Sequence, residues 1–107
     1  MNPVIELAVT EVHVTLITPR GGLIAMAKVV LNNALALDGI GVHRKLDGHG
    51  FRLTYPTRPT SGRESKTIFH PIKTSLSKAI EVAIFTEISK VQKVVARHDR
   101  HYPPDIG

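Results

Sequence analysis

The chain has 107 residues, enough for one domain with a single hydrophobic core. It contains no cysteine, which excludes a disulfide framework, a thiolate metal site and a cysteine nucleophile. A formal net charge of +5 at pH 7 and a pI near 9.9 make nucleic acid or acidic lipid the natural partners.

The N-terminal stretch MNPVIELAVTEV has no basic region followed by a long apolar run. No segment of the chain approaches the roughly 18 apolar residues of a membrane-spanning helix. We therefore expect neither secretion nor membrane insertion, and the lack of cysteine fits a cytoplasmic protein.

Residues 8–17 alternate between apolar and polar side chains, the pattern of a half-buried strand. Val12, Val14 and Leu16 fall on one face, and Glu11, His13 and Thr15 fall on the other. Residues 18–22 then provide a proline and two glycines for a hairpin turn.

Residues 23–31 are apolar on both faces, with Lys28 as the one charged side chain. Such a strand has to be covered from two directions. One helix covers one face, so we expect a second subunit to help cover the other. Asn32 and Asn33 predict the next turn, because asparagine tolerates positive φ.

The third strand, residues 34–44, changes phase in its middle. Leu35 and Leu37 share one register, and Ile40 and Val42 share the other. Asp38-Gly39 between them predicts either a hairpin, which would give five short strands, or a bulge in one bent strand. We favour the bulge.

Residues 47–50 turn the chain again and lead into a fourth strand. Its Phe51, Leu53 and Tyr55 are expected to face the core, and Arg52 and Thr54 to face solvent.

The next stretch, residues 56–72, is a polar and basic connector between the sheet and a helix. Two prolines, a glycine and three Ser/Thr residues before Arg63 predict that it lacks regular structure. Its apolar end, Ile68 to Ile72, is expected to dock on the body of the domain.

Apolar residues recur at three- and four-residue spacing from about Ser75 to Ala96 and predict one long amphipathic helix. Thr74 or Ser75 is the expected N-cap. The stripe, apolar apart from Glu87, consists of Leu76, Ile80, Ala83, Ile84, Glu87, Ile88, Val91, Val94 and Val95. We take residues 1–96 as one domain and 97–107 as a flexible polar tail.

The excess positive charge is local. Between Arg44 and Lys73 there are seven basic residues and two acidic ones, a difference that equals the net charge of +5 for the whole chain. A local excess of this kind indicates a contact surface for an anionic partner. The candidate contacts are Arg58, Arg63, Lys66 and Lys73, supported by Arg44, Lys45 and Arg52.

Lysine and arginine can follow a phosphate backbone and release counterions, and arginine adds bidentate contacts to phosphate or guanine. Aromatic stacking is scarcely available, because Phe51 and Tyr55 share the inward face of their strand, so backbone and groove contacts are expected. A second basic set on the helix is more typical of an ordinary solvated face: Lys78, Lys90, Lys93 and Arg97.

No catalytic or metal site is expected. His70 lacks the nucleophile and orienting carboxylate of a hydrolase at a known spacing, and we expect it to hydrogen-bond the connector to the body. His98 and His101, with Asp99 between them, are expected to be incidental rather than metal-binding. We expect no cofactor.

Several short motifs resemble the SpoVG (stage V sporulation protein G) family. They cover roughly residues 8–88 and comprise Ala8-Val9-Thr10-Glu11-Val12, Leu37-Asp38-Gly39-Ile40, Asp47-Gly48, Pro56-Thr57-Arg58 and His70-Pro71-Ile72. The resemblance implies a small dimeric bacterial cytoplasmic protein that binds DNA and RNA and regulates sporulation, septum formation or virulence genes. Arg58 and Lys66 match basic positions of the family loop. Two family features are missing: Pro59 stands where a second basic residue is common, and no acidic tail follows the helix.

The sequence therefore predicts an α+β fold, an antiparallel meander of four to five strands with one long C-terminal helix packed on one face. The predicted function is non-enzymatic nucleic-acid binding by a homodimeric regulator. The alternative is a protein-interaction module whose basic loop docks on an acidic protein partner.

Overall fold

The computed structural model describes residues 5–101, with side chains described up to Gln92. Four antiparallel strands form a meander sheet in the order β1-β2-β3-β4. Their bounds are Val9–Arg20 for β1, Leu23–Leu31 for β2, Leu35–Arg44 for β3 and Phe51–Thr54 for β4. A two-stranded ribbon of β5 (Thr57–Pro59) and β6 (Ser65–Thr67) follows, and then helix α1 (Thr74–His101). The predicted α+β class is confirmed.

The tight turns between the first three strands follow from residues that accept positive φ. Gly21 and Gly22 join β1 to β2 with φ of 57° and 91°. Asn32 and Asn33 join β2 to β3 with φ of 54° and 50°, as their residue type predicts.

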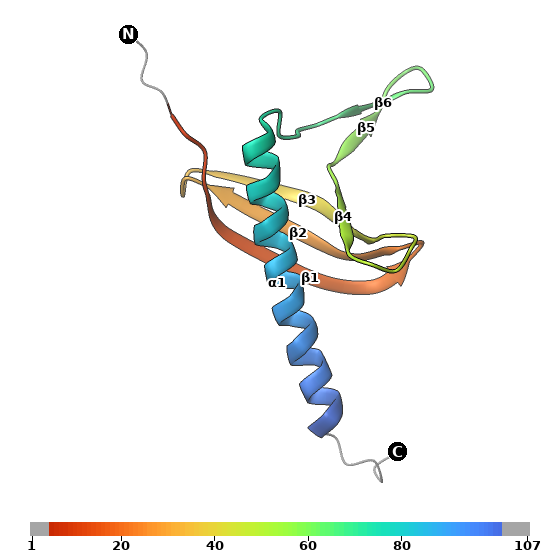
Figure 1. The fold of residues 1–107 in the computed structure, drawn as a ribbon. Helices are drawn as coiled ribbons and strands as arrows, with labels where there is room; N and C mark the ends of the chain where they lie inside the picture. The colour runs from red at the N-terminus through yellow and green to blue at the C-terminus, as the bar shows by residue number, and fades with distance from the viewer. Residues whose placement is uncertain (1–4, 102–107) are drawn as a thin grey trace.

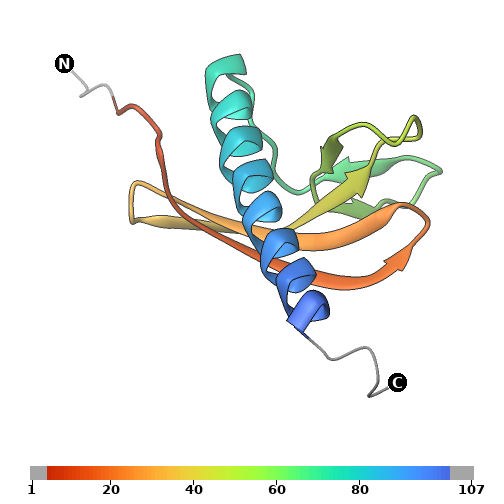
Figure 2. The ribbon, with the colours of Figure 1, turned by 60° about the horizontal axis from the view of Figure 1, so that its bottom comes forward.

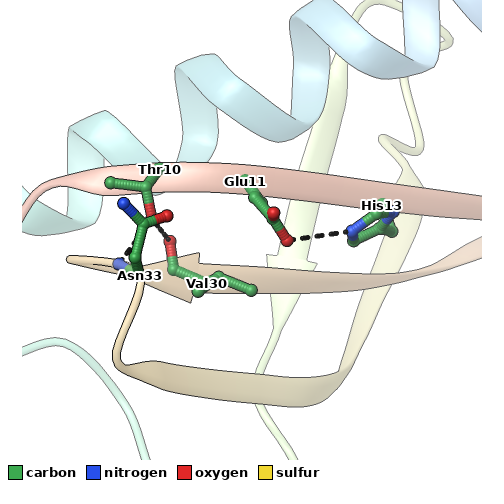
Figure 3. Close-up of polar contacts among 5 residues, drawn as sticks. All are labelled: Thr10, Glu11, His13, Val30 and Asn33. Atoms are coloured by element: carbon green, nitrogen blue, oxygen red, sulfur yellow. Dashed lines mark hydrogen bonds and ion pairs between the residues drawn. The ribbon is translucent and has the colours of Figure 1, made fainter.

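The β2–β3 turn also holds the start of the sheet. Thr10 Oγ1 donates to the Val30 carbonyl at 3.1 Å and accepts from the Asn33 N–H at 2.8 Å (Figure 3). Asn32 Oδ1 accepts from the Ala8 N–H at 2.8 Å, and its Nδ2 donates to the Glu6 carbonyl at 3.0 Å. One short turn therefore fixes residues 6–10, which come more than 20 residues earlier in the chain.

The phase change in the third strand is a bulge, as predicted. Val29 pairs with Leu37 and Ala27 with Ile40, so β3 contains one residue more than β2 across this interval. Gly39 has a φ of 86°, and its N–H donates to Asp38 Oδ1 at 2.7 Å. The strand continues on both sides, so the alternative hairpin does not form.

The core lies between the sheet and α1, which crosses one face of the sheet (Figures 1 and 2). Ile80, Ile84 and Ile88 are fully buried at four-residue spacing, and they match the centre of the predicted stripe. The helix starts at Thr74 rather than Ser75 and extends five residues past the predicted end at Ala96. Val94 and Val95 lie outside the described side chains, and most of the predicted tail, residues 102–107, lies outside the described residues.

The two faces of strand β2 are covered to different extents. Ala25, Ala27, Val29 and Leu31 are at most 2% exposed within the single chain, and Ile24 is 7% exposed. Met26, Lys28 and Val30 point to the other face and are half-buried. The single chain therefore covers one face of β2 and leaves the other face half-exposed, and dimerisation remains a prediction.

Two local expectations for residues 51–72 were wrong. Thr54 is not solvent-facing: it is half-buried, with its Oγ1 2.9 Å from His43 Nε2. In the apolar end of the connector, Phe69 packs against the core, but Ile68 and Ile72 are 60% and 90% exposed.

Candidate nucleic-acid interface

The most basic part of the connector is a two-stranded ribbon. Thr57 pairs with Thr67, Arg58 with Lys66, and Pro59 with Ser65. This corrects the prediction that residues 56–72 lack regular structure. All six ribbon residues are exposed. Figure 1 shows the ribbon projecting beyond the end of β4, away from the sheet.

The base of the ribbon is attached to the body of the domain. The Ile68 N–H donates to the Pro56 carbonyl at 2.8 Å, which extends the ladder by one bond. Tyr55 and Phe69 meet edge-to-face with ring centroids 6.1 Å apart. Pro56 lies against the bulge, since a Cβ built on Gly39 would be 3.8 Å from its Cβ. The bulge, β4 and the ribbon are therefore one packed unit.

The tip of the ribbon, residues 60–64, is closed by side-chain hydrogen bonds. Thr60 Oγ1 donates to the Glu64 carbonyl and accepts from the Gly62 N–H. Arg63 lies in this loop and is exposed. The ribbon therefore carries three of the four leading candidates: Arg58 and Lys66 directly opposite each other, and Arg63 at the tip.

The remaining four candidates lie elsewhere. Lys73 directly precedes α1, and its carbonyl accepts the Ser77 N–H at 3.0 Å, the first bond of the helix. Arg44, Lys45 and Arg52 lie at the end of β4 remote from the ribbon.

Arg44 and Arg52 do not share one surface, although they lie at the same end of β4. Arg44 pairs with Phe51 and lies on the α1 side of the sheet, its guanidinium carbon 5.9 Å from the centre of the Phe51 ring. Arg52 pairs with His43 and points to the opposite face. The basic residues that are clustered in sequence are thus divided between the ribbon, the start of α1 and the two faces of the sheet.

The ribbon charges have no carboxylate close enough to neutralise them. In the part of the chain whose side chains are described, the one ion pair joins Glu11 and His13 at 3.4 Å (Figure 3). Glu64, the one carboxylate within residues 57–67, makes no ion pair with the ribbon's basic side chains. Asp38 and Asp47 accept backbone N–H groups at turns: Asp38 from Gly39, and Asp47 from His49 at 2.9 Å. Arg58, Arg63 and Lys66 are therefore available to an anionic partner.

His43 and Thr54 form a polar contact on the sheet face opposite α1. A Cβ built on Gly41 would lie 2.6 Å from Thr54 Oγ1, so this contact needs glycine beside it. Burial, and secondarily the positive charge of Arg52, lower the pKa of His43 below its ordinary value. Sequence patterns did not single out this pair, because its members come from different strands.

His70 does not connect the loop to the body as expected. Its side chain is exposed, and Nδ1 donates to the carbonyl of its neighbour Pro71 at 3.3 Å. Among the side chains up to Gln92, no three His, Asp or Glu residues are grouped as metal ligands. His98, Asp99 and His101 lie beyond those described side chains.

A second feature, an apolar groove, was not predicted. It is lined by residues from the N-terminal segment, β2, β3, the connector and α1: Leu7, Leu31, Leu35, Leu37, Phe69, His70, Pro71, Leu76 and Ile80. Leu7 and Leu35 are about half exposed at its rim. The sequence did carry an indication, since Leu35 and Leu37 put two leucines on the same face of β3.

Comparison with known proteins identifies the family. The family model for SpoVG matches residues 7–90. A protein of Clostridium acetobutylicum named "Putative septation protein SpoVG" is 32% identical over 87 residues, which are 80% of this chain and 88% of that protein. A protein of the same name from Clostridium perfringens is 31% identical over 80% of this chain and 93% of its own length. Another, from Thermoanaerobacter pseudethanolicus, is 28% identical over 86% of this chain and 98% of its own length.

The matched region begins before β1 and ends within α1, so it includes the whole sheet, the bulge, the basic ribbon and most of the core-forming part of the helix. Within residues 5–101, no helix has the length and apolar character needed to cross a membrane. The order of elements, the motifs that carry the resemblance and the match over most of the chain agree: the chain belongs to the SpoVG family.

Proposed function

We propose that the chain is a non-enzymatic nucleic-acid-binding regulator that acts in the cytoplasm on gene expression, sporulation or division septation. The observation that carries the proposal is the ribbon, which holds Arg58 opposite Lys66 on an exposed projection. The names of the relatives support the link to septation. The family resemblance supports DNA and RNA as the ligands.

The electrostatics of the ribbon favour an anionic ligand. Like charges directly opposite on neighbouring strands destabilise the pair. A phosphate placed between Arg58 and Lys66 would replace this repulsion with two charge-assisted contacts and would release counterions from the nucleic acid. The energetic cost in the free protein thus becomes a gain on binding.

The test is fluorescence-anisotropy titration of duplex DNA, single-stranded DNA and RNA from low to physiological salt. The wild-type protein should show a steep loss of affinity with salt, since each duplex phosphate contact contributes a slope of about −0.9 in log K against log salt. The double variant Arg58→Ala/Lys66→Ala should bind more weakly, with a slope shallower by about 2. Its free energy of unfolding should change by less than about 0.5 kcal/mol, the usual range for surface substitutions.

The matched control is Lys78→Ala/Lys90→Ala, which removes the same charge from exposed positions of α1. The proposal expects this control to retain the wild-type slope. Equal effects of the two double variants would mean that binding follows net charge rather than the ribbon. Absence of binding to all three nucleic acids at low salt would contradict the proposal and favour the alternative, docking on an acidic protein.

We also propose that the protein is a homodimer, as the resemblance implies. The apolar groove supports this proposal, because Leu7 and Leu35 leave apolar surface open to solvent at its rim, which is more typical of a protein contact than of a free surface. A second copy of the chain would cover the groove and leave the ribbon free for nucleic acid.

A further inference from the structure

We propose that the ribbon enters the major groove of B-form DNA with its Arg58–Lys66 face toward the bases. This inference rests on the proposed function and goes further, because it names the form of nucleic acid and the groove. It depends on three properties of the ribbon: the division of its side chains between two faces, its width, and the absence of any aromatic residue in it.

The ribbon has one charged face and one small polar face. Directly opposite residues of an antiparallel pair point to the same side, and successive residues alternate. Arg58 and Lys66 therefore share one face. The other face carries small side chains: Thr57, Pro59, Ser65 and Thr67. Both faces are exposed, so neither is used to pack the ribbon on its own domain.

The width of the ribbon selects the groove. Paired strands lie about 4.8 Å apart, and a two-stranded ribbon with its side chains fits the major groove of B-DNA, which is about 12 Å wide. The minor groove, about 6 Å wide, is too narrow. The major groove of A-form RNA is deep and narrow, and side chains cannot read it. Duplex DNA is therefore the ligand that fits the ribbon.

The composition of the ribbon argues against single strands. Residues 57–67, TRPTSGRESKT, include no aromatic side chain on which an unpaired base could stack. Arginine is suited to the major groove, since its guanidinium can donate to both O6 and N7 of guanine. Arg63 at the tip is then placed to contact a phosphate at the groove edge.

The geometry of attachment also fits insertion. The ribbon projects past the end of β4 (Figure 1), and its base is held by the Ile68–Pro56 hydrogen bond and the Tyr55–Phe69 contact. Because the base is fixed while the tip is free of the sheet, the charged face can enter a groove without moving the core.

The experiment compares the wild-type protein on four probes of one sequence at fixed salt. They are an unmodified DNA duplex, a duplex whose cytosines carry glucosylated 5-hydroxymethyl groups that fill the major groove, a duplex whose minor groove is occupied by distamycin, and duplex RNA. Glucose adds no charge, so the phosphate contribution is unchanged. We expect unmodified and distamycin-loaded DNA to bind alike, and glucosylated DNA and RNA to bind at least tenfold more weakly.

The double variants identify the surface. Arg58→Ala/Lys66→Ala should lose most of the discrimination between unmodified and glucosylated DNA, while Lys78→Ala/Lys90→Ala should keep it. Equal binding of unmodified and glucosylated DNA, or competition by distamycin, would overturn the major-groove inference and leave the proposed function intact. Salt-independent or absent binding to every probe would overturn both.

Discussion

At the scale of single residues, the hydrogen bonding around the His43 ring favours its neutral form. One ring nitrogen, Nε2, contacts Thr54 Oγ1 at 2.9 Å, and the other, Nδ1, is buried without a hydrogen-bond partner. A neutral ring that donates from Nε2 leaves an unpaired acceptor at Nδ1. Protonation would place an unpaired N–H donor there, close to Arg52. The burial of the ring and the nearby positive charge of Arg52 both disfavour the protonated form, in agreement with the lowered pKa of His43.

The lowered pKa predicts how stability depends on pH. In the unfolded chain the pKa of His43 returns to its ordinary value of 6.5, so the unfolded state binds the proton more readily. The contribution of His43 is therefore fully present above pH 6.5 and is lost as the pH falls toward its folded pKa. Glutamine at position 43 keeps a donor for Thr54 but does not titrate. Urea unfolding at pH 7.5, 6.5 and 5.5 should therefore show that His43→Gln loses less stability than the wild type as the pH falls.

The control for this pH dependence is His49→Gln, a substitution in an exposed loop, which should retain the wild-type profile. If wild type and His43→Gln lose stability in parallel over this range, another group governs the acid response.

Residue type predicted the turns but not the hydrogen bonds that their side chains make to other segments. Positive φ at Asn32 and Asn33 follows from the tolerance of asparagine for that region. The bonds from the Asn32 side chain to residues 6 and 8 depend on where the strands align, which one-dimensional patterns do not contain.

At the scale of elements, α1 offers a sharp test of the core. Ile84 has no solvent-accessible surface and lies between Ile80 and Ile88, which are also fully buried. Ile84→Asp places an unpaired charge among aliphatic groups and should cost more than about 4 kcal/mol, a large part of the roughly 5–15 kcal/mol that stabilises a domain of this size, so folding should be disrupted. Circular dichroism and thermal unfolding would measure the loss.

The matched substitution on the same helix is Val82→Asp. Val82 is 64% exposed, so the same new charge remains in water and should change stability by no more than about 0.5 kcal/mol. A folded Ile84→Asp protein would show that α1 does not pack on the sheet through this face.

The ribbon is the element that sequence patterns missed, and its prolines explain why. Pro56 and Pro59 were taken as breakers because proline cannot donate a backbone hydrogen bond. The Ile68 N–H donates to the Pro56 carbonyl, so Pro56 and Ile68 form a hydrogen-bonded pair. Such pairs alternate along an antiparallel ladder, and the next one, two residues further on, is Arg58 with Lys66. Pro59 then falls at a non-hydrogen-bonded position, where a missing N–H costs the ladder nothing.

At the scale of the whole molecule, the individual strands and the long helix were predictable because alternation and helical periodicity depend on neighbours in sequence. The arrangement of the basic residues was not. Arg44 and Arg52 fall close together in sequence, yet the pleat directs them to opposite faces of the sheet. Charge counting singled out the basic segment, and the register shows that Arg58 and Lys66 lie directly opposite each other in it.

Assembly is the last property that belongs to this scale. The groove between the N-terminal segment, β3 and α1 leaves Leu7 and Leu35 exposed beside buried Leu31 and Ile80. A second copy that covers this groove should make Leu35→Asp monomeric in size-exclusion chromatography with light scattering, because the charge would have to be buried without a partner. The substitution should leave the fold intact, since Leu35 is 53% exposed in the single chain.

Leu46→Asp is the control for this test. Leu46 is a fully exposed leucine in the loop between β3 and β4, away from the groove, so its substitution should leave the dimer unchanged. A dimer that survives Leu35→Asp would place the contact elsewhere, with the half-buried sheet face of Met26 and Val30 as the next surface to test. A wild-type protein that is monomeric at every concentration would contradict the homodimer itself, and the ribbon would then have to bind DNA as a single arm.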